Sequence, residues 1–322
     1  IDPRCTQIGA FNLALAAWRR VGHCKLPAMN LACSGLAPNS READWLAIAG
    51  DNEKLQNGME RLYRLFKDAP VLGSLINPRL SAKDMYVADY HELQPLLERA
   101  LAQEAKDDTA HEMAVTARGL AKAAEILTSQ FTLVATNVPY LGRGKQEDEL
   151  KNYCESIHPE AKADLSTCFV ERCVDFCAPC GTTVLVTPQN WFFLGTYKKL
   201  RQHMFRDTEW NLVVKLGPAA FQNMNFWAAK TALCVLSRRA PNGTALITGF
   251  DVSDTRDPSV KATLLLTSPS CVVRQLAQLN NPDARLLLSE MDNLPLLETH
   301  GAAFPGIATA DYSRFGRCFW EL

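Results

Sequence analysis

The sequence predicts an α/β fold with a doubly wound, mostly parallel sheet. Short apolar runs bounded by turn residues alternate along the chain with longer stretches in which apolar residues recur at helical spacing. This alternation is typical of parallel strands joined by crossover helices. The chain has 322 residues, of which 47% are apolar and 21% are charged. This length and composition are those of a globular protein with a sizeable core.

The expected elements follow one another along the chain. Helical spacing, as in Ile8, Phe11, Leu15 and Trp18, predicts helices over residues 6–20, 41–67, 91–129 (one helix or two), 164–175 and 195–204. Apolar runs that end at Gly, Pro or polar residues predict strands over residues 25–35, 131–136, 181–188, 212–217 and 231–239. The turn-forming run APNGTA (240–245) indicates a boundary after residue 240.

Composition excludes several classes of function. The formal net charge of -1 gives no overall basic field, so nucleic-acid binding would need a local basic patch. No apolar run reaches the roughly 18 residues of a membrane span, and no secretory signal is visible. Eleven cysteines without a repeating framework are typical of reduced thiols. We therefore expect a cytoplasmic protein that does not enter a membrane.

The cysteines and histidines do not predict a metal site. Cys168, Cys173, Cys177 and Cys180 include one CxxC, but they fall on an expected helix and its end, without a second CxxC or a histidine at ligand spacing. Buried thiols that pack this helix are the favoured interpretation. The six histidines are scattered, and no Ser/His/Asp arrangement is visible.

The segment ATNVPYLGRGKQ (135–146) directly follows an apolar run, and we expect it at the carboxyl end of a central parallel strand, where ligands bind in such sheets. Pro139 biases Val138 towards an extended backbone, which fixes the direction of the Val138 carbonyl. The Asn137 side chain offers a second acceptor, and two acceptors suit an NH₂ donor. Tyr140 offers a ring for stacking on a heterocycle. The segment therefore indicates a pocket for an aromatic amine, such as that of a nucleobase.

TNVPY resembles the Asn-Pro-Pro-Tyr motif of the amino-methyltransferases, which use S-adenosylmethionine. The longer string TNVPYLGRGKQ is similar to the large adenine-specific DNA methyltransferases of restriction and phage-exclusion systems. Further segments resemble this family in the family's order: IDPRCTQIGAFNLALAAW (1–18), FKDAPVLGSLINP (66–78), GTTVLVTPQNWFFLGTYKKLR (181–201), GPAAFQNMNFWAAKTALCVLSR (217–238) and GIATADYSRFGRCFWEL (306–322).

The resemblance implies a Rossmann-like methyltransferase fold that is incomplete at its N-terminus, because the family's first cofactor-binding strand and Gly-rich turn would precede Ile1. It divides the chain into a catalytic core (1–240) and a connecting segment that leads into a target-recognition domain (241–322). We expect the isolated chain to bind the cofactor weakly or not at all, and hence to be inactive alone.

The implied activity is methylation of the N6 amine of adenine in DNA within a restriction-modification or phage-defence system. Asn137 and the Val138 carbonyl, in a loop held by Pro139, would accept hydrogen bonds from the amine. Tyr140 and Phe221 would stack on the two faces of the flipped base. The implied cofactor contacts are Asp68 and Asp2, and the implied DNA-phosphate contacts are Arg143 and Lys145. DNA and other restriction or defence subunits are the expected partners.

Each of these assignments has an alternative. The Asn-X-Pro-Tyr segment also fits an ordinary turn, Phe221 a core residue, Asp68 a solvated helix end, and Arg143 with Lys145 a solvated loop. Val138 stands where the family usually has proline, although the chemistry needs only its carbonyl. For the chain as a whole, the alternatives are an RNA or protein amino-methyltransferase and a non-catalytic DNA-binding or scaffold fragment.

Overall fold

The computed structural model describes residues 3–81 except 28, 39 and 48, together with residues 108–221, 230–289 and 300–301. The chain divides into two compact units, Ile1–Leu288 and Ser289–Leu322. All the helices and strands given below lie in the first unit.

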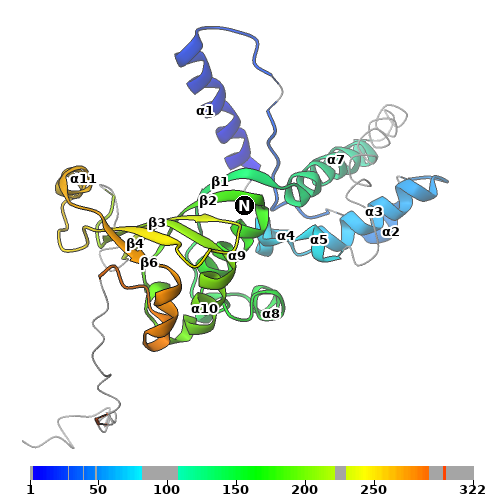
Figure 1. Cartoon of the computed structure of the whole chain (residues 1–322). Helices are drawn as coiled ribbons and strands as arrows, with labels where there is room; N and C mark the ends of the chain where they lie inside the picture. Colours follow the sequence, from blue (N-terminus) through cyan, green and yellow to red (C-terminus); the bar gives the residue numbers. More distant parts are fainter. Residues whose placement is uncertain are drawn as a thin grey trace, which may run out of the picture. The chain divides into compact units, whose positions relative to one another are not determined.

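A six-stranded mixed sheet has the order β1-β2-β4-β3-β5-β6 (Figure 1). Its strands are β1 (Phe131–Asn137), β2 (Cys177–Pro188), β3 (Glu209–Gly217), β4 (Thr231–Ser237), β5 (Leu246–Asp251) and β6 (Cys271–Arg274). β1 is parallel to β2 and β3 is parallel to β5, whereas β4 and β6 run antiparallel to their neighbours. Four of the six strands therefore share one direction, and the prediction of an α/β fold with a mostly parallel sheet is confirmed.

The helices lie between and before these strands in the chain. They are α1 (Pro3–Val21), α2 (Glu42–Ala47), α3 (Glu53–Phe66), α4 (Ala69–Leu72), α5 (Pro78–Ser81), α7 (Asp108–Thr128), α8 (Asp148–Ile157), α9 (Leu165–Phe176), α10 (Lys198–Asp207) and α11 (Pro258–Thr267). Short 3₁₀ turns are η1 (Gly73–Leu75), η2 (Arg143–Lys145), η3 (Asn190–Phe192), η4 (Gly195–Tyr197), η5 (Leu276–Asn280) and η6 (Pro282–Ala284). Within the described residues, no helix is both long enough and apolar enough to cross a bilayer.

Several sequence-based boundaries were wrong. The described residues of 25–35 form no strand. The helix predicted over 41–67 is two helices, because the chain turns after Ala47 and Asn52 caps α3 by accepting a 3.1 Å hydrogen bond from the Leu55 N–H. Residues 82–107, which include part of the helix predicted over 91–129, lie outside the described residues.

The sheet also extends past residue 240, where we expected a boundary. β5 pairs in parallel with β3, and β6 pairs with β5. The first compact unit accordingly continues to Leu288, so the expected division at 240 does not coincide with the compact units. The pairing of β3 with β5 keeps the segment after residue 240 in the same sheet, which the turn-forming composition of 240–245 does not reveal.

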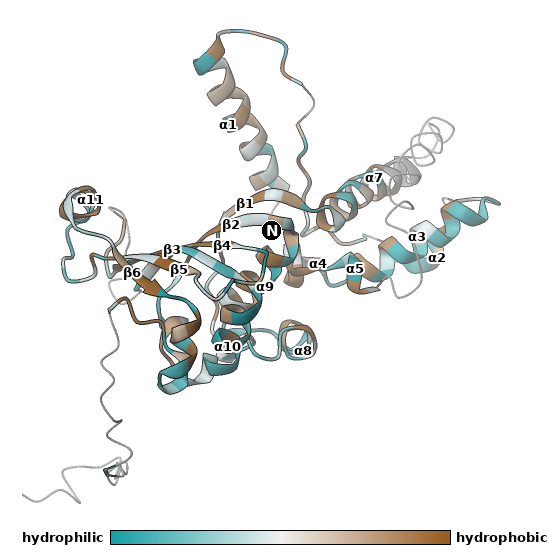
Figure 2. Ribbon diagram, in the orientation of Figure 1, coloured by the Kyte–Doolittle hydropathy of each residue, from teal (hydrophilic) through white to brown (hydrophobic). Residues whose placement is uncertain are grey.

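The two larger of three apolar clusters form most of the core of this unit. One lies between the sheet and the helices α9 and α10, and its centre is an aromatic group of Trp191, Phe192, Phe205 and Trp210. Helix α10 is mostly hydrophilic along its length (Figure 2), yet it buries Leu200, Met204 and Phe205 against this group. The other cluster joins α2, α3 and α7.

The four cysteines differ from expectation in their placement. Cys168 and Cys173 are buried in α9, but β2 already begins at Cys177, so Cys177 and Cys180 belong to a strand rather than to a helix end. Cys180 is exposed and has a left-handed φ of 64°. Burial raises the pKa of the Cys173 thiol to about 12 and that of Cys177 to about 11. These two thiols therefore stay protonated at neutral pH and pack as apolar groups.

Arg172 in α9 connects the two clusters. Its fully buried guanidinium donates hydrogen bonds from Nη2 to the carbonyls of Ile76, at 2.7 Å, and Leu127, at 3.0 Å. The same guanidinium lies 3.8 Å from the centre of the Phe176 ring. Burial lowers the pKa of Arg172 to about 10, so the group remains charged at neutral pH.

We expect Arg172→Met to reduce the free energy of unfolding by about 3 kcal/mol, because two buried carbonyls lose their donor. Urea denaturation followed by circular dichroism measures this change. Arg239→Met is the matched control, since Arg239 forms an exposed ion pair with Glu209 and should leave the urea midpoint unchanged. Equal midpoints for both variants would show that Arg172 does not hold the clusters together.

Candidate active site

The loops that follow β1, β2 and β3 leave the same edge of the sheet, because these strands point in one direction. In open α/β sheets this carboxyl edge is where ligands bind. Asn137–Tyr140 follows β1, and Phe221 lies four residues after the end of β3. The fold therefore brings the expected base-binding residues to one edge.

The loop after β1 is fixed by its pairing with β2. Asn137 is in register with Val186, and the Val138 N–H donates a 3.2 Å hydrogen bond to the Val186 carbonyl. The Val138 side chain is only 3% exposed, whereas Asn137, Pro139 and Tyr140 are exposed. Val138 thus anchors the loop, and its neighbours face solvent.

The Tyr140 ring is 41% exposed, and its hydroxyl donates a 3.4 Å hydrogen bond to Asn137 Oδ1. Burial, with a smaller contribution from the charge of Asp164, raises the pKa of the Tyr140 phenol above its ordinary value. The phenol therefore stays protonated at neutral pH. An amide oxygen has two lone pairs, so Asn137 retains one acceptor site for another donor.

Pro188 at the end of β2 leaves the Val138 carbonyl without a ladder partner. In a parallel pair, the N–H of a residue donates to one carbonyl of the partner strand. The carbonyl of the same residue then accepts from the N–H that lies two residues further along the partner strand. Val186 accepts from Val138, so the returning donor would be residue 188, and proline has no N–H. The Val138 carbonyl and Asn137 Oδ1 are therefore two neighbouring acceptors at the end of β1.

Our expectation that β1 is a central strand does not match the described sheet. β1 is the first strand in the order, and no strand pairs with its other side within the described residues. Leu133 in β1 is 61% exposed. A strand position depends on partners far away in the chain, and the apolar pattern of 131–136 carries no information about them.

The remainder of the loop is held by the start of α9. The Leu165 N–H donates to the Leu141 carbonyl at 3.0 Å, and the Arg143 N–H donates to the Ala163 carbonyl at 3.0 Å. Asp164 caps α9 by accepting a 2.8 Å hydrogen bond from the Ser166 N–H. The exit loop of β1 is therefore tied at both ends, to β2 and to the first turn of α9.

The two cations of the loop differ in their surroundings. Arg143 donates a 2.8 Å hydrogen bond to Glu155, a carboxylate that also accepts from Lys162 at 2.5 Å. Lys145 is exposed and forms no ion pair within the described part of the chain. Lys145 is thus available to a phosphate at once, whereas Arg143 would first have to leave Glu155 or share it.

Phe221 is 46% exposed, in a segment that leaves β3 through left-handed residues, Gly217 with a φ of 67° and Ala219 with a φ of 51°. β2 and β4 separate β1 from β3, so these two loops start about 14 Å apart at ordinary strand spacing. Residues 222–229 lie outside the described residues. Stacking of Phe221 on a base stays a prediction.

Lys261 in α11 supports the segment that carries Phe221, and no sequence pattern singled it out. Its buried ammonium donates to the carbonyls of Leu216 at 2.5 Å, Val252 at 3.1 Å and Thr255 at 2.5 Å. Burial lowers the pKa of Lys261. A lysine in a helix ordinarily predicts a solvated side chain, so only the fold reveals that the Lys261 ammonium binds carbonyls at the ends of β3 and β5.

Of the two predicted cofactor contacts, Asp68 lies within the described residues and stays a prediction. Asp68 is half-buried at the junction of α3 and α4, and its carboxylate forms no capping hydrogen bond there. Helix α4 packs against α8, which follows the loop of Asn137–Tyr140. Asp68 therefore offers a carboxylate near the elements that carry the loop. Asp2 lies outside the described residues.

Residues 1–221 match the Eco57I restriction-modification methylase family. The match covers more than half of the chain, and the protein therefore belongs to this family. The resemblance to adenine-specific methyltransferases of restriction and phage-exclusion systems is confirmed at the level of the family.

Individual relatives share a limited part of their length with this chain. An adenine-specific methyltransferase PglX of Lacticaseibacillus casei (strain Zhang) is 30% identical over 128 residues, which are 39% of this chain and 10% of the relative. An adenine-specific methyltransferase BrxX of Escherichia coli O9:H4 (strain HS) is 26% identical over 191 residues, 59% of this chain and 15% of the relative. The chain thus spans about a tenth to a seventh of these proteins.

Solved structures with similar folds include a DNA-bound Type ISP restriction-modification enzyme, LlaBIII. It is 12% identical, with a TM-score of 0.41, and the match covers 73% of this chain and 20% of LlaBIII. A putative class I S-adenosylmethionine-dependent methyltransferase from Listeria monocytogenes is 15% identical, with a TM-score of 0.33, over 55% of this chain and 60% of that one.

We expect Tyr140 to titrate above the ordinary tyrosine value of about 10. Asp164→Asn should lower the Tyr140 pKa part of the way, since asparagine keeps the helix cap but removes the charge, while burial, the larger cause, persists. Ultraviolet titration of each protein and of its Tyr140→Phe derivative isolates this phenol. A Tyr140 that titrates at or below the ordinary value would contradict the partial burial of the phenol.

Proposed function

We propose that this chain supplies the catalytic core of an adenine-specific DNA methyltransferase that transfers a methyl group from S-adenosylmethionine to the N6 amine. The observation that carries the proposal is the pair of acceptors at the end of β1, Asn137 Oδ1 and the Val138 carbonyl, within the region matched by the methylase family. The names of the PglX and BrxX relatives support adenine as the substrate base.

In this mechanism the two acceptors act on the amine of the target base. The lone pair of an aromatic amine is delocalised into the ring, which makes the nitrogen a poor nucleophile. Hydrogen bonds from its two N–H groups to Asn137 and Val138 favour a pyramidal nitrogen and stabilise the positive charge that develops on it. Because β2 holds Val138 and Tyr140 contacts Asn137, both acceptors are positioned before substrate arrives.

The base must leave the duplex to reach these acceptors. Tyr140 presents a partly exposed ring beside Asn137 for stacking, and Phe221 presents a second exposed ring at the same edge. Lys145 offers a positive charge to a phosphate of the flanking strand, with Arg143 as a second candidate. We infer that DNA binds along this edge.

S-adenosylmethionine would supply the electrophilic methyl group. The described residues fit this cofactor in part, because Asp68 has a half-buried carboxylate whose oxygens form no capping bond and are suited to hydroxyl or amine donors. Asp2 is the second proposed contact. We further propose a cytoplasmic enzyme that works with DNA and with other restriction or defence subunits.

Asn137→Ala should slow methyl transfer by roughly 10²–10³, by analogy with the loss of one preorganised transition-state hydrogen bond. DNA affinity should be unchanged, because contacts to phosphates dominate it. The measurement is single-turnover methylation of duplex DNA by the full-length protein, with DNA binding determined in parallel. Asn152→Ala, an exposed position in α8, is the matched control.

Methylation by Asn137→Ala at the parental rate would show that the loop is an ordinary turn. Activity of the parent on RNA or protein, but not on DNA, would support the substrate alternatives. DNA binding by the parent without methylation of any of these substrates would support a non-catalytic fragment.

Pro188→Ala should slow methyl transfer about fivefold, since the new N–H donates to the Val138 carbonyl and weakens it as an acceptor for the amine by about 1 kcal/mol. The same single-turnover assay measures the change. Pro241→Ala, in the turn before β5, is the control and should have the parental rate. An unchanged rate in Pro188→Ala would mean that the Val138 carbonyl does not contact the amine.

A further inference from the structure

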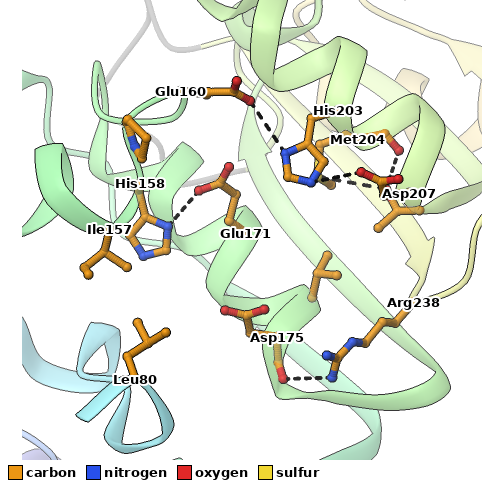
Figure 3. A pocket seen from close by; sticks show the side chains of 13 residues that line it. Leu80, Ile157, His158, Glu160, Glu171, Asp175, His203, Met204, Asp207 and Arg238 are labelled. Atoms are coloured by element: carbon orange, nitrogen blue, oxygen red, sulfur yellow. Dashed lines mark hydrogen bonds and ion pairs between the residues drawn. The ribbon is translucent and has the colours of Figure 1, made fainter. Parts of the chain in front are cut away.

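A second site lies at the opposite edge of the sheet from the candidate active site. A pocket of about 510 Å³ is lined by residues of the α8–α9 connection, α9 and α10 (Figure 3). Its lining includes Asp175 just before β2, Thr208 just before β3, and Arg238 just after the antiparallel β4. These three residues define the amino edge of the parallel strands, whereas Asn137–Tyr140 follows their carboxyl edge.

Three potential metal ligands converge in this pocket. One ligand atom each from Glu160, Glu171 and His203 lies within 4.8 Å of the other two. The closest ion pair among them joins His203 Nδ1 and Glu160 Oε2 at 3.6 Å. An octahedral or tetrahedral ion with bonds of about 2.0–2.1 Å holds neighbouring ligand atoms roughly 3 Å apart. Small side-chain rotations therefore suffice to surround an ion.

The imidazole of His203 is already oriented as a ligand. Its Nε2 lies 3.1 Å from Asp207 Oδ2, one helical turn further along α10. A carboxylate that accepts from one ring nitrogen leaves the lone pair on the other, which is the usual arrangement behind a metal-binding histidine. Figure 3 shows Asp207 on one side of the ring and Glu160 on the other.

A buried histidine gives an independent indication of a ligand. His158 is only 3% exposed, and its Nδ1 lies 2.7 Å from Glu171 Oε2. Its Nε2 has no hydrogen-bond partner among the described residues. In Figure 3 this second nitrogen faces the pocket on the side of Leu80. Buried polar atoms are nearly always paired, so a ligand that offers a donor inside the pocket would satisfy this nitrogen.

We propose that Glu160, Glu171 and His203 bind a divalent first-row transition-metal ion, with Asp207 and His158 orienting the ligands. Two carboxylates and one imidazole suit an ion of the Mn²⁺ class, which takes oxygen and nitrogen donors and completes its sphere with water. The ion connects the α8–α9 segment, α9 and α10, and so stabilises the helical layer that packs on β2 and β3. This site does not depend on the proposed methyltransferase activity.

Mn²⁺ binding to the full chain tests the site, since Mn²⁺ has little affinity for the exposed thiols. Electron paramagnetic resonance measures free Mn²⁺ during a titration, and we expect one ion per chain. Glu171→Gln and His203→Ala should each weaken binding at least tenfold. The matched controls are Glu149→Gln and His23→Ala, which change exposed residues that do not line the pocket and should bind as the parent does.

Thermal denaturation gives the second measurement. Mn²⁺ should raise the Tm of the parent and of both controls, and should leave the Tm of His203→Ala unchanged. The His203 side chain is 54% exposed, so this variant folds even if Glu171→Gln does not. Parental Mn²⁺ affinity in His203→Ala, or the absence of binding by the parent, would overturn the proposal.

Discussion

The candidate active site depends on the parallel pairing of β1 with β2. The register that sets Asn137 opposite Val186 also directs the Val138 N–H to the Val186 carbonyl and brings Pro188 opposite the Val138 carbonyl. A shift of one residue would turn every side chain of β1 to the other face and would present an N–H where proline now has none. The position of both acceptors is therefore a property of the strand pair rather than of the loop alone.

Buried cations hold the other loops by binding backbone carbonyls. Arg172 binds carbonyls at the ends of η1 and α7, and Lys261 binds three carbonyls around the ends of β3 and β5. Arg201 in α10 acts similarly, donating to the carbonyls of Trp191 at 2.6 Å and Asp283 at 2.7 Å. Burial lowers the pKa of Arg201 to about 10, so it too remains charged at neutral pH. Each cation satisfies several carbonyls at or just beyond the ends of helices and strands.

The two edges of the sheet carry different chemistry. The carboxyl edge presents neutral acceptors and aromatic rings, as Asn137, Tyr140 and Phe221 show, which suits a planar heterocycle with an amine. The amino edge presents carboxylates and imidazoles, which suit a cation. Helix α9 contacts both sites. The backbone at its start bonds the exit loop of β1, and its residues further along line the pocket that holds Glu171. A stable helical layer thus supports both sites.

The sequence by itself determined the α/β class, most strands of the sheet and the loop at 137–140. Apolar periodicity and an Asn-X-Pro-Tyr segment are local features, which can be recognised without knowing which distant residues they contact. The tertiary structure decided what depends on distant contacts. It placed β1 first in the order of the described sheet, continued the sheet through β5 and β6, and buried Lys261. It also brought His203 to Glu160 and Glu171, which no spacing predicts, because these residues lie on separate elements that meet only after α9 and α10 pack on the sheet.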